Sequence, residues 1–223
     1  MKRVSDRYGL GVLIAAGSIW GLAEAGLGMY MRGMCARTMT GSVMTGLAIF
    51  FISLGMAYRR KMLAATIVLS VAIVFKLLDA CLLHLPILHG AVINPVFGFA
   101  TEAMAFVFLF MVLGAHLRAR GYGRIVLGGL SALVAVNLFP LVGYVTTIPA
   151  CVYPGTAYPL SLYYAPIAVA ISMVTCPLGM ELGEKLASLE RQEGWVAKPI
   201  MARGSFPALA VSALAVMIML RVF

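Results

Sequence analysis

Long apolar stretches with almost no charge recur along the whole chain, and they restrict its fold more than any other feature. Crossing the ~30 Å hydrocarbon core of a bilayer takes about 20 apolar residues of α-helix. Inside lipid, only helices and closed barrels satisfy every backbone hydrogen bond. Unbroken runs such as MLAATIVLSVAIVF favour helices. We therefore expect an all-α fold, a polytopic bundle of transmembrane helices.

The apolar stretches define six to seven spans in a single integral membrane domain that covers residues 1–223. The composition agrees, because only 11% of the residues are charged, whereas soluble domains have about 25%. The first apolar segment exceeds the roughly 7–15 residues of a signal-peptide core, so it is expected to stay as a helix. The predicted spans are 9–31, 39–58, 62–84, 96–117, 124–147, 160–183 and 205–221.

The 17 lysine and arginine residues sort between alternate loops, and this distribution predicts the orientation. Cytoplasmic loops of membrane proteins are enriched in these residues. With a cytoplasmic N-terminus, the exceptions are Arg32, Arg37 and Arg221 on the outside and Lys76 within a span. We expect a multi-pass protein of the inner (cytoplasmic) membrane. The net charge of +9 is thus attributed to topology, and nucleic acid is not expected as a partner.

Ionisable residues within the spans are the strongest functional signal. Glu24, Lys76, Asp79 and Glu102 lie in predicted helices, where a lipid-facing charge costs about 2.5 to 3.5 kcal/mol. With a rise of 1.5 Å per residue, Glu24, Lys76 and Glu102 reach one layer, roughly 5 to 8 Å outward of the midplane. Asp79 follows Lys76 by three residues and shares its face. These side chains are expected to form one outward-facing polar site.

Other residues are predicted to complete this site. Trp20 lies one turn before Glu24 on the same helix face, and Asn94 lies at the outer end of the fourth helix. Small residues at 17, 21 and 25 permit close helix packing and predict a central position for the first helix. The uncharged loop VTTIPACVYPGTAYPLSLYY is expected to form a stiff lid.

A purely structural role is the alternative for these charges. Lys76 would then neutralise Glu24 or Glu102 and hold three helices in register. However, one lysine does not pair three acids, so a proton, a cationic ligand or water would share the site, and intramembrane charges are by default functional. The predicted substrate-binding residues are Trp20, Glu24, Lys76, Asp79, Asn94 and Glu102.

No cofactor is predicted. The chain contains no CxxC or CxxCH spacing, so iron–sulfur, haem c and structural zinc have no support, and its three histidines offer no facing pair for haem b. No metal site is predicted either, because the spacing of Asp79, His84, His89 and Glu102 is not a known ligand motif. Cys35 and Cys151 fall in outside loops, where a disulfide and two free thiols are both compatible with the sequence.

The small helical bundle, with a polar cluster in its outer half under short uncharged loops, resembles the S components of energy-coupling-factor vitamin transporters over roughly residues 8–186. The resemblance implies a small vitamin-like substrate and a transmembrane coupling subunit with two ATPases. Solitary proteins of this type that take up cobalamin imply Cys81 or His84 as an axial cobalt ligand. Gly11 and Ala15, with the small residues after them, stand in place of the usual Ala-x-x-x-Ala coupling motif. The apparent seventh helix departs from the usual six.

The expected function is therefore transport, as a substrate-binding membrane protein and not an enzyme. The alternative is a membrane-anchor subunit of a respiratory or other redox complex, with redox subunits as partners. In that case the carboxylates and Lys76 would line a quinone or proton site. An enzyme that acts on a lipid is a third option, but the sequence shows no evident nucleophile with a base.

Overall fold

Helices make up nearly all of the described structure, which confirms the all-α prediction. This structure is a computed structural model, and it describes residues 2–33, 37–117, 121–192 and 199–222. Within these ranges, the extended backbone pairs only at an isolated bridge between Val152 and Pro159. The elements are α1 (Lys2–Gly33), α2 (Arg37–Arg59), α3 (Met62–Leu82), α4 (Gly90–Leu117), α5 (Gly121–Leu138), η1 (Phe139–Leu141), α6 (Val142–Thr146), α7 (Leu160–Tyr163), α8 (Ala165–Gln192) and α9 (Pro199–Val222).

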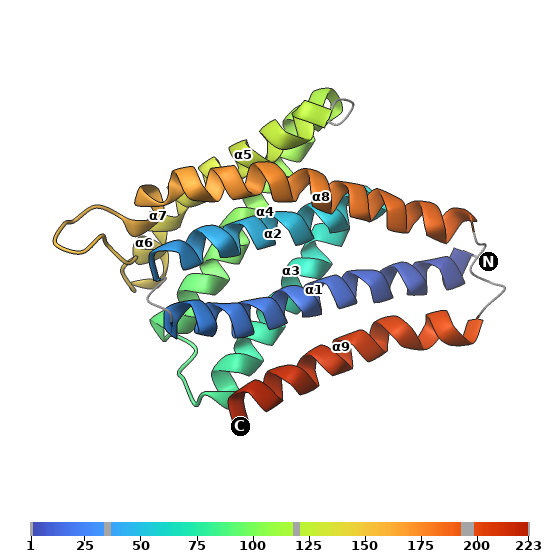
Figure 1. Cartoon of the computed structure of the whole chain (residues 1–223), viewed down its shortest axis with the longest axis horizontal. Coiled ribbons are helices and arrows are strands. Elements are labelled where there is room, and N and C mark those ends of the chain that lie inside the picture. Colours follow the sequence, from blue (N-terminus) through green and yellow to red (C-terminus); the bar gives the residue numbers. More distant parts are fainter. Residues whose placement is uncertain (1, 34–36, 118–120, 193–198, 223) are drawn as a thin grey trace.

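Six helical segments in the described ranges are long and apolar enough to cross a membrane, and each overlaps one of the first six predicted spans. A further apolar segment, Phe206–Arg221 of α9, is shorter than the roughly 20 residues that a bilayer core requires. Nevertheless, α9 runs alongside α1 and in the same direction (Figure 1). The six segments are Gly9–Leu27, Met39–Arg59, Met62–Leu82, Gly90–Leu113, Gly121–Thr146 and Ala165–Arg191.

The fourth helix begins earlier than the sequence predicts. α4 starts at Gly90, so that Pro95 lies inside the helix instead of before it. The backbone of His84 adopts φ +54°, which turns the chain after α3. His89 then caps α4, because its Nδ1 accepts a hydrogen bond from the Ala91 backbone N–H at 3.2 Å. Pro95 was a misleading boundary signal: it removes one backbone hydrogen bond and crowds the carbonyl four residues earlier, yet α4 continues through it.

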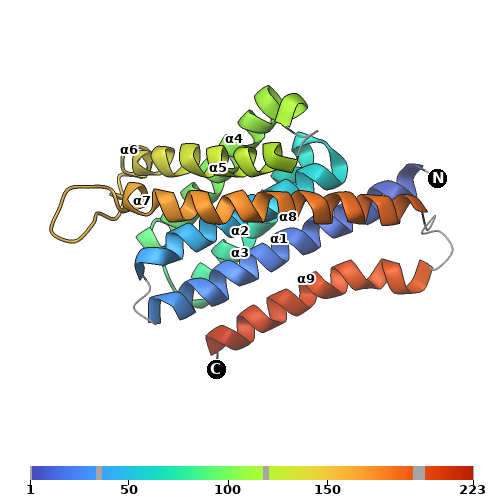
Figure 2. The same cartoon turned by 45° about the horizontal axis from the view of Figure 1, so that its top comes forward.

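The helix at the centre of the bundle is α2, and the predicted central position of α1 is wrong. α2 contacts α1, α3, α4, α5 and α8, whereas α1 contacts α2, α3 and α9. α2 lies beside α8 in both views (Figure 1, Figure 2). The small residues of α1 pack against two neighbours: Gly17 and Gly21 face α3, and Gly11 and Gly26 face α9. Close packing on these two sides does not place α1 at the centre.

Close backbone packing joins α2 to α8. A Cβ atom on Gly179 would overlap the carbonyl oxygen of Phe50 and the hydroxyl of Ser53. The Ser53 hydroxyl also donates a hydrogen bond to the Cys176 carbonyl oxygen at 3.2 Å. Small residues and interhelical hydrogen bonds are the usual means of helix association in membranes. Close packing and this hydrogen bond together hold α2 against α8.

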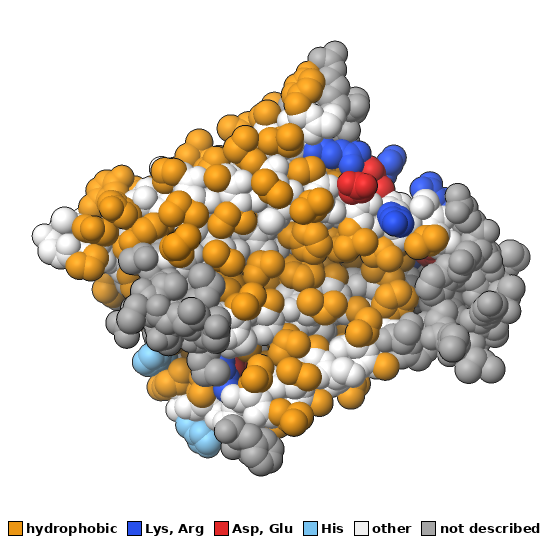
Figure 3. All heavy atoms as spheres, in the orientation of Figure 1, with side chains coloured by type: hydrophobic (Ala, Val, Ile, Leu, Met, Phe, Trp, Pro, Cys, Tyr) orange, Lys and Arg blue, Asp and Glu red, His pale blue; other side chains and the backbone are white. Residues whose placement is uncertain are grey.

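The surface has an apolar body and one charged end. Hydrophobic side chains cover most of the face shown in Figure 3, and most of the visible charge gathers at one end. Near the C-terminal end of α8, Glu184 pairs with Arg124 at 2.9 Å and Glu190 pairs with Arg59 at 3.2 Å. These side chains are partly exposed, so each pair contributes about 0 to 1 kcal/mol. The distribution is that of a multi-pass membrane protein.

Candidate functional site

A cavity of about 140 Å³ lies between α1, α3, the start of α4 and α9. It is near the C-terminal end of α3, so the length of that helix separates it from the ion pairs of α8. Charged side chains form part of its wall, and small or aliphatic side chains form the rest. The lining residues are Glu24, Ala25, Lys76, Asp79, Ala80, Leu83, Leu85, Ala91, Val92 and Arg221.

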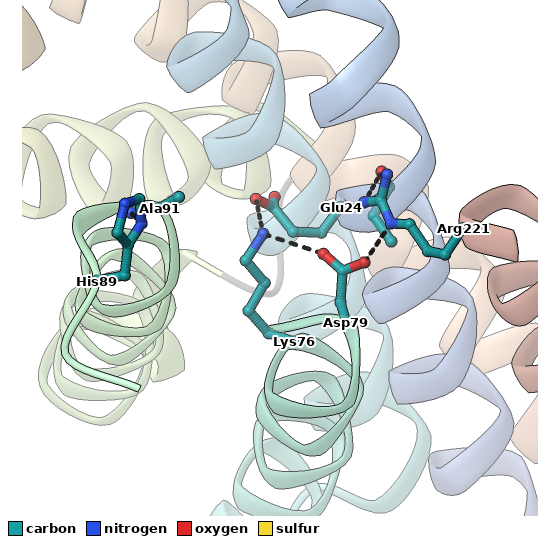
Figure 4. Close-up of polar contacts among 7 residues, drawn as sticks. Glu24, Lys76, Asp79, His89, Ala91 and Arg221 are labelled. Atoms are coloured by element: carbon teal, nitrogen blue, oxygen red, sulfur yellow. Dashed lines mark hydrogen bonds and ion pairs between the residues drawn. The ribbon is translucent and has the colours of Figure 1, made fainter. Parts of the chain in front are cut away.

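Lys76 lies between two carboxylates in this cavity. Its Nζ is 3.7 Å from Glu24 Oε1 and 3.7 Å from Asp79 Oδ2 (Figure 4). The three side chains are buried, with exposed fractions of 8%, 6% and 3% respectively. Both distances exceed those of a hydrogen bond. The lysine therefore balances two acids electrostatically without a close bond to either.

Arg221, which the charge distribution predicts in an outside segment, supplies a second cation to the cavity. Its Nε donates to Asp79 Oδ1 at 2.5 Å (Figure 4). Its Nη2 donates to the Ala25 carbonyl oxygen at 3.0 Å. The side chain is only 5% exposed. Two signals pointed to it: a basic residue on the outer side opposes the positive-inside rule, and acids outnumbered the single intramembrane lysine. The acidic excess among these side chains is therefore smaller than predicted.

Two glycines of α1 bring Glu24 within reach of α3. A Cβ on Gly21 would overlap Phe75, and a Cβ on Gly17 would lie 2.6 Å from the Val68 carbonyl oxygen. Only glycine permits this approach, which is how small residues act in membrane helices. Glu24 follows Gly21 by three residues and so stays on the face that meets α3.

The small residues of α1 that replace the Ala-x-x-x-Ala coupling motif pack against other helices of the same chain. Gly17 and Gly21 contact α3, and Ala15 is buried. Gly11 faces α9, because a Cβ there would lie 3.3 Å from Phe206 Cβ. This stripe of small residues is consequently covered by α3 and α9 in the described structure.

Three of the six predicted site residues do not line the cavity. The Glu102 carboxylate is buried and lies near the Thr45 side chain. Trp20 is fully buried against Phe99, with ring centroids 4.7 Å apart. In the described ranges, neither Trp20 Nε1 nor Asn94 Oδ1 has a hydrogen-bond partner. The structure thus brings the Glu24, Lys76 and Asp79 side chains together and places the others outside the cavity wall.

The candidate metal ligands are not gathered into a site. Cys81 and His84 are both exposed. No group of three or more His, Cys, Asp or Glu side chains in the described segments is arranged to hold a metal ion. Cys151 is an exposed free thiol, and Cys35, its predicted partner, lies outside the described residues.

The loop between α6 and α7 is not a lid over this cavity. It projects beyond the end of the bundle in both views (Figure 1, Figure 2). A hydrogen bond from the Leu160 N–H to the Cys151 carbonyl oxygen at 2.9 Å closes the loop, and Tyr153 stacks on Tyr163 at 4.2 Å. None of its residues belongs to the cavity wall. Its tyrosines therefore order the loop itself.

The cavity is suited to a small polar solute. A dry cavity of about 150 Å³ holds benzene, and a water molecule occupies about 30 Å³, whereas sites for drug-sized ligands span about 300 to 1,000 Å³. The charged side chains supply donors and acceptors to fix such a solute, and the aliphatic ones cover its remaining surface. Comparison with protein-family models, curated proteins and solved structures gives no match to this chain.

Proposed function

We propose that this protein is a membrane transport protein that binds a small polar solute in the cavity between α1, α3 and α9. One observation carries the proposal: buried charged side chains from three apolar helices converge on a cavity. Charges inside membrane proteins are costly and commonly mark substrate pathways. We propose that the protein lies in the inner (cytoplasmic) membrane. By the positive-inside rule, the basic end of the bundle then faces the cytoplasm, and the cavity lies in the outer half of the membrane.

The size of the cavity narrows the proposed substrate. About 140 Å³ is smaller than the usual sites for vitamin-sized ligands. The solute we propose is therefore smaller than most vitamins, and a larger one requires α9 to move away from α1. Since α3 and α9 cover the small residues of α1, a coupling subunit with ATPases would contact a different surface.

Lys76→Ala is expected to abolish solute binding while membrane insertion persists. The substitution removes the ammonium that lies between Glu24 and Asp79, and it leaves an apolar helix that still inserts. Lys61→Ala is the matched control, because Lys61 is exposed beside the start of the same helix. Native mass spectrometry of the gently solubilised protein is expected to show a small polar molecule on the wild type and on the control only.

Two outcomes would contradict the proposal. Retention of the bound molecule by Lys76→Ala would favour a purely structural pairing of the lysine. Co-purification of redox subunits, with quinone in place of a polar solute, would favour the membrane-anchor alternative.

A further inference from the structure

The ammonium group of Lys76 lines the cavity but has no acceptor within hydrogen-bond distance among the described residues. It has three N–H donors. Its ion-pair partners, Glu24 and Asp79, are both beyond hydrogen-bond distance, and the described part of the chain offers no other partner. Its side chain is 92% buried, since 8% is exposed. Because Lys76 lines the cavity and neither carboxylate is within hydrogen-bond distance, its ammonium group can donate charge-assisted hydrogen bonds to a ligand oxygen there.

The neighbouring carboxylates restrict the charge of that ligand. A ligand that is only an anion would place a third negative group beside Glu24 and Asp79, both of which lie within 4 Å of Lys76. A ligand that is only a cation would leave Lys76 without an acceptor and would approach Arg221. Like charges in contact oppose binding, whereas charge-assisted hydrogen bonds favour it. A ligand with one negative and one positive group can pair the first with Lys76 and the second with the carboxylates.

We propose that the cavity binds a small zwitterion, with its carboxylate on Lys76 and its ammonium group against Glu24 and Asp79. The volume of about 140 Å³ limits this solute to about five to eight heavy atoms, by comparison with benzene in a cavity of about 150 Å³. Short ω-amino acids have this size. The inference rests on the proposed function, because it names the substrate class of the same site.

Small probes that differ in charge test the charge requirement in the full chain. Thermal unfolding in detergent is followed with glycine, β-alanine or 4-aminobutanoate, and with propionate, propylammonium or propionamide. At least one amino acid is expected to raise Tm in a dose-dependent way, by about 3 °C at ten times its Kd. The three probes that lack one or both charges are expected to leave Tm unchanged.

A charge-balanced variant tests the part played by Lys76. Glu24→Gln with Lys76→Gln removes one carboxylate and the ammonium together, so no net charge is added to the cavity. This double variant is expected to unfold cooperatively and to lose the shift in Tm caused by the amino acid. Lys61→Gln, at an exposed position, is expected to keep the shift.

The outcomes separate this inference from the proposed function. Stabilisation by propionate, propylammonium or propionamide alone would overturn the zwitterion and keep the cavity as a solute site. Stabilisation of the double variant to the same extent as the wild type would overturn the role of Lys76. Failure of all six probes would overturn the zwitterion, whereas native mass spectrometry independently decides whether the wild type holds another solute.

Discussion

Asp79→Asn is expected to destabilise the protein by about 3 to 5 kcal/mol, because it removes a buried carboxylate that two cations share. Asp79 accepts a hydrogen bond from Arg221 at 2.5 Å and lies 3.7 Å from Lys76. The asparagine has the same shape but no charge, so both cations lose an anionic partner in a buried position. Because Arg221 belongs to α9, the substitution also weakens the attachment of that helix to α3.

A double-mutant cycle measures this coupling. Arg221→Gln alone is also expected to destabilise, and the double variant with Asp79→Asn is expected to lose less stability than the sum of the two. The expected interaction energy is about 2 kcal/mol, within the range for residues in contact. Thermal or denaturant unfolding in detergent supplies the four values. Additive effects would show that Arg221 and Asp79 do not stabilise the fold as a pair.

Glu184→Gln is the control for the general effect of removing an ion pair. Glu184 and Arg124 are 2.9 Å apart, but 38% and 22% of their side chains are exposed. A pair of this exposure contributes about 0 to 1 kcal/mol. A loss as large as that of Asp79→Asn would mean that burial does not distinguish the two pairs.

The fold was predictable from the sequence because membrane helices have one dominant requirement. Runs of apolar residues fix where six helices lie, but some of their ends were wrong. α4 starts at Gly90 instead of 96, and α8 runs from Ala165 to Gln192 instead of from 160 to 183. The cap that His89 provides depends on the path of the chain between α3 and α4, which periodicity does not encode. The central position of α2 was also not predicted, because it depends on contacts with helices that are distant in sequence, such as α8.

For the candidate site, the sequence predicted only the depth of each side chain along the bundle. Depth follows from residue count, and it correctly brought Glu24 to the level of Lys76. The position around the helix axis and the identity of the neighbouring helix do not follow from depth. Glu102 therefore lies near Thr45, outside the cavity wall. Arg221 belongs to α9, and no local sequence pattern predicts that α9 contacts α1.

Gly179→Ala is expected to destabilise the protein by about 2 kcal/mol, which lowers Tm by about 4 to 8 °C. The added methyl group would overlap the Phe50 carbonyl oxygen, and backbone atoms of a packed helix do not move aside as a side chain does. The contact of α2 with α8 is the most extensive in the bundle, so separating the two helices affects the whole core.

Gly41→Ala makes the same chemical change with the opposite expected sign. Gly41 lies in α2, it is exposed, and a Cβ atom there meets nothing within 4 Å. Alanine is favoured over glycine in a helix by about 1 kcal/mol, so this variant is expected to be as stable as the wild type or slightly more stable. The two variants unfolded under the same conditions separate steric overlap from helix propensity. If Gly179→Ala matched Gly41→Ala, the close approach of α8 to α2 would not limit the stability of the bundle.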